Sequence, residues 1–289
     1  MTWLDATAWR FAGASVAGTA HLRDGRPCQD AGRCTLVAPS APQASALLAC
    51  GADGAGSAAR GDEGARLACA SFVEAVERLC ASGGLPGVDA AADGERDAWW
   101  SAFVAEWLAR FQSEVEGQAE RVAGKGRDFA CTFLGALVGE GWAGLVQIGD
   151  GAIVVDHGDE PDRYAPFVWP QRGEYANETY FATDRRAPER LVLGVVPRRV
   201  EEIALLTDGL QGLVLDYARM APHDPFFRRM FAPVRSAPPG ESGALSAALA
   251  AFLGSPRVRS RTDDDTTLIL ATRRTSPSDA AGKPDGAGI

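Results

Sequence analysis

Apolar residues in the first half of the chain recur at the spacings of strands and helices in turn. Alternation over residues 9–21 predicts a first strand, and the apolar run over 45–54 predicts a buried strand that ends in a turn. Residues 57–83 predict a helix, because their large apolar side chains recur every three or four positions. A second long helix is predicted over 95–122, and its stripe of aromatic residues is interpreted as core rather than as a haem or flavin site. The stripe consists of Trp99, Phe103, Trp107 and Phe111.

From residue 128 onward the apolar pattern has a period of two. Three stretches joined by short turns predict a β-meander, and further strands and short helices follow it. Because helices and hairpin-spaced strands are segregated along the chain, the order predicts an α+β fold with antiparallel sheets rather than a doubly wound fold. We expect one domain over residues 1–273 and a disordered tail over 274–289. The predicted strands cover 129–138, 142–151, 152–158, 198–209 and 266–273, and the short helices cover 210–220, 224–232 and 241–253.

The composition is that of an acidic globular protein. Of the 289 residues, 46% are hydrophobic and 23% are charged, and 38 acids against 29 bases give a net charge of −9. This balance disfavours nucleic acid as a partner, because neutralising phosphates requires a basic face. No apolar run approaches the about 20 residues that span a bilayer, and the N-terminal residues lack the pattern of a signal peptide. We therefore expect a cytoplasmic protein without a membrane partner.

The six cysteines and three histidines are scattered along the chain. No two cysteines form a CxxC pair, whereas structural zinc sites typically have ligands paired a few residues apart. We interpret the cysteines as reduced thiols, several of them buried on apolar segments. Nothing in the pattern supports a Ser–His–Asp or a Cys–His enzyme.

Aspartates stand at the ends of the predicted strands. Asp53 follows LLACGA, Asp150 follows LVQIG, and Asp208 follows IALLT. Asp264 lies just before TTLILAT, and Asp30 is placed in the loop after the first strand. Such positions let carboxylates from distant parts of the chain converge at one rim of a sheet. Because carboxylates in close proximity repel each other and raise each other's pKa values, the pattern predicts hard divalent cations with oxygen ligands.

Each of these features also has a simpler explanation. An Asp-Gly pair after a strand is a common turn signature, and a plain hairpin turn is the alternative for Asp150 in particular. The acidic run 263–265 can be a solvated turn. The glycine-rich segment 51–61 is compatible with phosphate binding, but it matches neither the GxxxxGK[ST] nor the GxGxxG spacing of nucleotide sites.

Five motifs occur in a recognisable order: QDA near the N-terminus, ADGAGS after a strand, IGDGAIVV, LLTDGLQ and finally DDDTTLIL. Together they resemble the PPM (PP2C-type) metal-dependent serine/threonine phosphatases. GTAHLRDGRPCQDA and GEYANETYF are similar to sequences of the bacterial branch of that family. No single motif is specific, but five in this order over residues 9–273 are. The resemblance implies a four-layer α-β-β-α sandwich, with two central, mostly antiparallel sheets flanked by helices.

The resemblance also implies a centre with two Mn²⁺ or Mg²⁺ ions. Asp53 would bridge both ions, and the backbone carbonyl of Gly54 would bind one of them. Asp208 and Asp264 would complete the site that Asp53 holds. The implied mechanism is attack of a metal-bridged hydroxide on the phosphorus of phosphoserine or phosphothreonine, with no covalent phosphoenzyme.

Two more aspartates match the family less centrally. Asp30 would bind through the water shell of the ions, and Asp150, together with Asp208, would hold a weaker third ion. Asp53 and Asp208 would then be catalytic as well as metal-binding residues.

The phosphate-binding arginine is where the chain departs from the family pattern. The family usually has an acidic residue just before the first aspartate and an arginine about five residues before it, where this chain has Gln29 and Gly25. Arg26 is our choice for this role, with Arg23 and His21 as alternatives. The simpler interpretation of Arg26 is an exposed loop charge.

Two other departures concern residues around the centre. Ala55 stands where some members have a histidine proposed as general acid, so protonation of the leaving group would fall to water on a metal. The usual glycine/aspartate motif before the TDG strand is missing, and residues 173–184 occupy that region. We interpret this segment either as a lid or substrate-facing loop or as a structural hairpin.

The leading hypothesis is a Mg²⁺/Mn²⁺-dependent phosphoprotein phosphatase. Its partners would be phosphoprotein substrates and, by resemblance, a cognate bacterial serine/threonine kinase, and we expect it to be a monomer. Gln29 and the unassigned arginine motivate an alternative, a catalytically weak regulatory or binding module that keeps the fold, although all five aspartates remain. An acidic calcium-binding protein is a third hypothesis, but its usual DxDxDG run is absent.

Overall fold

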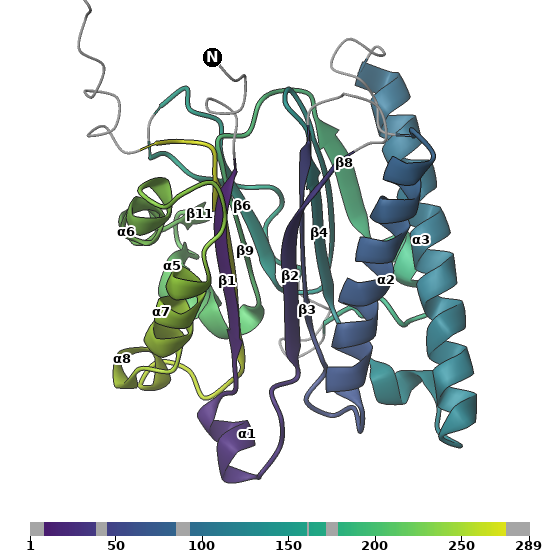
Figure 1. Cartoon of the computed structure of the whole chain (residues 1–289). Helices are drawn as coiled ribbons and strands as arrows, with labels where there is room; N and C mark the ends of the chain where they lie inside the picture. Colours follow the sequence, from purple (N-terminus) through teal and green to yellow (C-terminus); the bar gives the residue numbers. More distant parts are fainter. Residues whose placement is uncertain (1–8, 39–44, 85–92, 161, 172–178, 276–289) are drawn as a thin grey trace, which may run out of the picture.

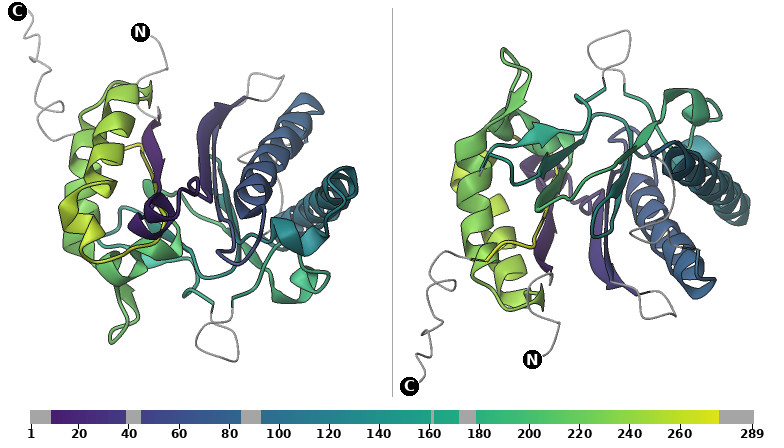
Figure 2. Two further views of the ribbon diagram at one scale, coloured as in Figure 1. Left: turned by 90° about the horizontal axis from the view of Figure 1, so that it is seen from below. Right: turned by 90° about the horizontal axis from the view of Figure 1, so that it is seen from above.

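Two β-sheets lie face to face at the centre of the protein, and helices cover both outer sides (Figure 1). Figure 2, which looks along the strands, shows the succession of helices, sheet, sheet and helices. The predicted α+β class and the four-layer α-β-β-α arrangement are therefore confirmed. The computed structural model describes residues 9–38, 45–84, 93–160, 162–171 and 179–275.

The first sheet has five antiparallel strands in the order β2-β3-β4-β5-β8. Two long helices, α2 (Gly61–Ala81) and α3 (Asp93–Arg121), cover its outer face. They are the two helices predicted from the periodicity of the sequence. The strands are β2 (Asp30–Val37), β3 (Ala46–Asp53), β4 (Phe133–Val138), β5 (Ala143–Ile148) and β8 (Val192–Val196).

The second sheet has six strands in the order β12-β1-β13-β9-β6-β7. The β1–β12 pair is parallel and the other described pairs are antiparallel. Helices α6 (Asp224–Arg235) and α7 (Gly243–Leu253) pack against the outer face of this sheet. The strands are β1 (Arg10–Val16), β6 (Ala152–Asp156), β7 (Ala165–Pro166), β9 (Glu202–Leu206), β12 (Gly240–Glu241) and β13 (Thr266–Thr272).

Short elements connect these layers. The helical ones are α1 (Thr19–Arg23), η1 (Gly126–Phe129), α4 (Ala187–Arg190), η2 (Asp208–Leu210), α5 (Gln211–Val214) and α8 (Pro256–Arg259). β10 (Leu215–Asp216) pairs with β11 (Ala221–Pro222), so a hairpin occupies the second half of the helix predicted over 210–220.

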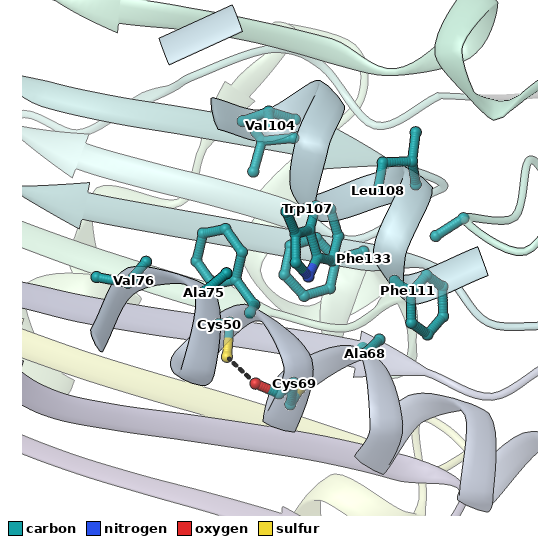
Figure 3. Close-up of a cluster of buried hydrophobic side chains, with 14 of the residues drawn as sticks. Cys50, Ala68, Cys69, Ala75, Val76, Val104, Trp107, Leu108, Phe111 and Phe133 are labelled. Atoms are coloured by element: carbon teal, nitrogen blue, oxygen red, sulfur yellow. Dashed lines mark hydrogen bonds between the residues drawn. The ribbon is translucent and has the colours of Figure 1, made fainter. Parts of the chain in front are cut away.

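The aromatic stripe of α3 packs into the apolar layer between the helices and the five-stranded sheet (Figure 3). Trp107 and Phe111 are fully buried there, and each such side chain contributes about 1.5–3 kcal/mol to folding. The indole N–H of Trp107 donates to Ser71 Oγ at 3.0 Å. Trp100, which lies outside the predicted stripe, is also fully buried and donates to the Leu145 carbonyl at 2.9 Å. The interpretation of the stripe as core is confirmed.

All six cysteines are free thiols, as the sequence indicated, and four of them are buried. Burial raises the pKa of the Cys131 thiol well above its ordinary value, which keeps it protonated and unreactive. Among the described residues, no helix has the length and apolar character required to cross a bilayer.

The ends of two predicted elements differ from the structure near the N-terminus. The first strand stops at Val16, and α1 follows it where alternation predicted more strand. Asp30 is not in a loop but is the first residue of β2. Sequence analysis did not predict β2 or β8, the two edge strands of the five-stranded sheet. β2 (DAGRCTLV) mixes polar and apolar residues, whereas β8 (VLGVV) is a short apolar run that was not recognised as a strand.

The predicted β-meander is also only partly correct. β4 and β5 form a hairpin, but β6 belongs to the other sheet. The turn at residues 149–151 therefore carries the chain from one sheet to the next and is not a hairpin turn. Apolar residues that recur with a period of two predict strands, but they do not indicate which sheet each strand joins. The predicted tail over 274–289 falls almost entirely outside the described residues.

Candidate active site

β2 begins and β3 ends at the lower end of the sheets in Figure 1. Five aspartates from distant parts of the chain stand at or next to strand ends of this kind. Asp30, which begins β2, is the register partner of Asp53, which ends β3. In the other sheet, the start of β6, the end of β9 and the start of β13 are side by side, because Leu206 pairs with both Ala152 and Leu268. The aspartate cluster consists of Asp30, Asp53, Asp150, Asp208 and Asp264.

The centre of the cluster is formed by Asp53, Asp150 and Asp208. One carboxylate oxygen from each lies within 4.8 Å of the corresponding oxygens of the other two. All three residues are partly buried, so their carboxylates face a shared space that is only partly open to water. The convergence predicted from the strand ends is thus present, and it includes Asp150, for which a plain hairpin turn was the alternative.

Asp30 lies behind this centre and is almost fully buried. Its Oδ2 accepts hydrogen bonds from the hydroxyls of Thr207 at 2.7 Å and Thr267 at 2.8 Å. Its Oδ1 is buried and has no hydrogen-bond partner in the described part of the chain. The same is true of Asp150 Oδ1. Buried carboxylate oxygens without partners are costly unless a cation or a proton satisfies them.

Asp264 is exposed, whereas its neighbour Asp265 is buried. Asp265 accepts hydrogen bonds from the backbone N–H groups of Gly18 at 2.7 Å and Gln29 at 2.5 Å, and His21 Nδ1 lies 2.8 Å from its Oδ2. It therefore ties the start of β13 to α1 and β2. The sequence showed three consecutive aspartates but no sign that the last of them is structural.

Burial raises the pKa of four carboxyl groups in the aspartate cluster, those of Asp30, Asp53, Asp150 and Asp208, and it is the largest cause in each case. Repulsion by other cluster aspartates adds to it at Asp53, Asp150 and Asp208. The pKa of Asp208 rises to about 8 and that of Asp30 to about 7. For Asp53, whose pKa is raised well above its ordinary value, the causes after burial are the charges of the four other cluster aspartates. The site therefore favours species that neutralise carboxylates, namely protons or cations.

The raised pKa values make the stability of the cation-free protein depend on pH. Because folding raises the pKa of Asp208 from 3.8 to about 8, the native state binds a proton that the unfolded state releases. Stability is therefore highest at low pH and is lost as the pH rises toward 8. In EDTA we expect the free energy of unfolding, measured by urea titration, to fall by about 1 kcal/mol or more between pH 6 and pH 8.

Excess Mn²⁺ should reverse this trend, since a cation competes with protons for the same carboxylates. A free energy of unfolding that falls with pH equally in EDTA and in Mn²⁺ would contradict cation binding by the cluster.

The donor set fits hard divalent cations. Among the described residues the centre offers carboxylate oxygens, which are the ligands that Mg²⁺ and Mn²⁺ prefer, and two of the buried cluster oxygens have no partner there. The structure places Gly54 next to Asp53, and a Cβ at Gly54 would lie 2.3 Å from the carbonyl carbon of Gly61. Only glycine fits there, which lets the start of α2 pack closely on the loop that follows Asp53.

Three glutamines fix the turn that carries Asp150. Gln171 Oε1 accepts from the N–H of Gly149 at 2.8 Å, and Gln147 Nε2 donates to the carbonyl of Gly151 at 3.0 Å. Gln211 Nε2 donates to the carbonyl of Asp150 itself. These residues hold the Asp150 turn in one position. Sequence analysis missed all three: Gln171 and Gln211 lie far from the turn in sequence, and Gln147 is a buried polar residue within an otherwise apolar strand.

Of the candidate phosphate-binding residues, Arg26 contacts the loop that follows Asp53. Its guanidinium donates to the Gly56 carbonyl at 3.2 Å and to Gln29 Oε1 at 3.1 Å. Arg23 is exposed and pairs with Asp24, and His21 is engaged by Asp265. Gln29, a departure from the family pattern, thus holds Arg26 in place.

The structure describes only part of the segment predicted as a lid or a hairpin over 173–184, because residues 172–178 lie outside the described residues. The described part, 179–184, contains turns and no strand. It is anchored at Ala182, whose N–H donates to the Cys131 carbonyl at 2.8 Å. Gln112 of α3 donates to the carbonyls of Ala182 and Asp184 at 2.9 and 2.8 Å. Phe181 packs against Ala55 and its neighbours, so this part borders the aspartate cluster.

Comparisons with known proteins identify the family of the chain. Residues 17–254 match the family model described as Protein phosphatase 2C. The chain is 38% identical over 264 residues to serine/threonine-protein phosphatase 3 of Escherichia coli (strain K12), an alignment that covers 91% of this chain and 98% of the relative.

Solved structures of phosphatases share the fold. The S. agalactiae serine/threonine phosphatase superposes with a TM-score of 0.59 at 12% identity, covering 93% of this chain and all of that one. A serine/threonine phosphatase from Staphylococcus aureus superposes with a TM-score of 0.56 at 15% identity, covering 94% and 98% of the two chains.

Proposed function

Because the chain belongs to the protein phosphatase 2C family and is a serine/threonine protein phosphatase, we propose that it hydrolyses phosphoserine and phosphothreonine at a dinuclear Mn²⁺ or Mg²⁺ centre. The observation that carries this proposal is the convergence of Asp53, Asp150 and Asp208 within 4.8 Å. The cluster is partly buried, and two of its buried oxygens have no partner among the described residues, so it fits divalent cations.

In this proposal Asp53 would bind both cations, and the carbonyl of Gly54 would bind one of them. Asp208 and Asp264 would bind the cations from the six-stranded sheet. Outside these ligands, Asp30 acts through water. Its position behind the centre supports this role, because Thr207 and Thr267 already hold one of its oxygens.

Asp150 is proposed to hold, with Asp208, a weaker third ion. Its buried Oδ1 without a partner supports this assignment, as does the rigid turn that the three glutamines hold.

When bound, the cations would supply a nucleophilic water of lowered pKa and neutralise the phosphoryl oxygens. The residues of the chain position the reaction. The aspartates fix the cation sites. Arg26, on the connection between α1 and β2 and in contact with the Gly56 carbonyl, binds and orients the phosphoryl group. Ala55 offers no proton, so the proton for the leaving group comes from water rather than from a side chain at that position.

Replacing Arg26 by alanine is expected to raise KM for a phosphothreonine peptide by roughly tenfold or more, because a charge-assisted contact to phosphate contributes about 1.5–3 kcal/mol. Arg26→Lys should recover only part of this loss, since an ammonium lacks the planar fork of a guanidinium. Steady-state kinetics at saturating Mn²⁺ measures both effects.

Arg23→Ala is the matched control for Arg26→Ala, because Arg23 lies on the same short connection but pairs with exposed Asp24. Its KM should be unchanged. A normal KM in Arg26→Ala together with a large rise in Arg23→Ala would move the phosphate contact to Arg23. Normal values in both, and in His21→Ala, would leave phosphate binding to the cations alone.

The proposed function is tested by phosphate release from phosphothreonine and phosphoserine peptides in Mn²⁺. We expect release from both, and none from either peptide with the Asp53→Ala variant. A folded wild-type chain that releases no phosphate from any of these peptides would overturn the proposal and favour a regulatory module that keeps the fold. We further propose that the substrates are cytoplasmic proteins phosphorylated by a serine/threonine kinase.

A further inference from the structure

A cavity of about 320 Å³ lies next to the aspartate cluster, and its charged lining is mainly basic. Three arginines and one aspartate contribute to it. Ile148, Tyr180 and Phe181 form its apolar wall. We call this cavity the arginine pocket. Its charged residues are Asp184, Arg185, Arg186 and Arg190.

The wall of the arginine pocket is continuous with the proposed active site. Ile148 is the last residue of β5, two positions before Asp150. The Tyr180 carbonyl lies 3.2 Å from the point that a Cβ on Gly149 would occupy. Phe181 packs against the small cluster of Ala55, Ala58 and Ala130, the first two of which lie in the segment that follows Asp53. The pocket therefore borders both the Asp150 turn and the loop after Asp53.

Its arginines are placed to receive an anion. Arg185 is exposed and forms no ion pair with any residue that the structure describes. The guanidinium of Arg190 lies 4.6 Å from the centre of the Tyr180 ring, which keeps its charge at the pocket wall. Arg186 pairs with Glu189, but both side chains are largely exposed, so this pair is weak and exchangeable.

The pocket is also preformed. The Arg190 carbonyl accepts from Gln171 Nε2 at 2.6 Å, so the residue that anchors the Asp150 turn also anchors the end of the pocket. Gln112 of α3 fixes the beginning of the same segment. The cavity is anchored at both ends and includes one arginine, Arg185, without an ion pair among the described residues, so it suits an anionic ligand although the chain has a net charge of −9.

We propose that the arginine pocket binds an anionic group of the substrate close in sequence to the phosphorylated residue, either an acidic side chain or a second phosphoryl group. This inference rests on the proposed phosphatase activity. A peptide whose phosphorylated residue occupies the aspartate cluster must leave the cluster over the residues that surround it, which include the wall of the arginine pocket. Because an extended chain advances by about 3.3 Å per residue, a neighbour within a few positions reaches the adjoining pocket.

The experiment compares phosphothreonine peptides of one parent sequence on the full-length chain in Mn²⁺. One peptide has neutral flanks, and the others carry glutamate or phosphoserine at single positions up to four residues on either side. Mass spectrometry follows loss of phosphate from the threonine, and the readout is the ratio of kcat/KM for each anionic peptide to that for the neutral peptide. Any general loss of activity cancels from this ratio.

For the wild-type chain we expect the ratio to reach about fivefold or more at a preferred position, the factor given by an ion pair at a partly exposed site. Arg185→Glu should bring it to one or below. Arg229→Glu is the matched control, because Arg229 is an exposed arginine of α6 on the opposite outer layer, and its ratio should equal that of the wild type.

A preference for glutamate identifies an acidic side chain as the ligand, and a preference for phosphoserine alone identifies a second phosphoryl group. A wild-type ratio near one at every position, or a preference that survives in Arg185→Glu, would overturn the inference while the phosphatase activity stands. Absence of hydrolysis of the neutral and the anionic peptides alike would overturn the proposed function and, with it, this inference.

Discussion

Replacing Asp53 by alanine is expected to lower kcat for a phosphothreonine peptide by about a thousandfold or more. In the proposed centre Asp53 binds both cations, which contribute several kcal/mol of transition-state stabilisation, and each 1.36 kcal/mol corresponds to about a tenfold change in rate. Steady-state kinetics over a range of Mn²⁺ concentrations measures the loss and shows whether added metal restores activity. We expect no recovery at any concentration.

The fold of this variant should survive. Burial and, after it, the charges of four other aspartates raise the pKa of Asp53, so removing its carboxylate relieves both a desolvation cost and repulsion. The contacts that hold its backbone remain, because they are the hydrogen bonds that join Asp53 N–H to Thr132 Oγ1 and Thr132 N–H to the Asp53 carbonyl. In EDTA the free energy of unfolding should equal or exceed that of the wild type. An Asp53→Ala chain that is unfolded in EDTA would instead assign Asp53 a structural role. Asp24→Ala, a change at an exposed aspartate, serves as the control for activity.

Replacing Arg235 by alanine is expected to lower the free energy of unfolding by about 3–5 kcal/mol, because it leaves a buried carboxylate without its partner. Arg235 Nη2 lies 2.6 Å from Glu202 Oε2 and 2.5 Å from Asp162 Oδ1. Glu202 is fully buried and also accepts hydrogen bonds from Tyr164 and Thr272 at 2.8 Å. Urea unfolding followed by tryptophan fluorescence measures the change.

Arg228→Ala is the control for this variant. Arg228 contacts the same Asp162 at 3.2 Å, but its side chain is 56% exposed, so its loss should cost about 1 kcal/mol or less. Equal costs for the two arginines would contradict the account, since burial of Glu202 is what distinguishes them. The carboxylates of Asp156, Asp162 and Glu202 are close enough to hold a cation. Arg235 and Arg274 already neutralise them, which separates this ionic cluster from the aspartate cluster.

Strands and helices with one strongly buried face could be predicted from the sequence. β3 forms an apolar run because every one of its residues before Asp53 is buried. α2 and α3 show helical periodicity because each of them buries one face. β2 could not be predicted this way, since five successive residues of this edge strand, 32–36, are partly or fully exposed and leave no alternation to detect. The assignment of β6 to the second sheet depends on the Asp150 turn, which local periodicity does not describe.

The aspartates of the site were predictable because each abuts the end of a strand, and register then brings those ends together. Their supports were not predictable. Asp265 looks like its two exposed neighbours in sequence, yet it is buried because Gly18, His21 and Gln29 surround it. These contacts, like those of Gln171 and Gln211 with the Asp150 turn, join residues whose separation in sequence gives no pattern to detect.

The central claim is that the aspartate cluster holds the divalent cations on which phosphatase activity depends. The most direct test is hydrolysis of a phosphothreonine peptide by the purified chain after dialysis against EDTA, with and without added Mn²⁺. Because carboxylate sites of this kind bind Mn²⁺ and Mg²⁺ reversibly, we expect no activity in EDTA and full recovery when Mn²⁺ is returned. Undiminished hydrolysis in excess EDTA would contradict the claim.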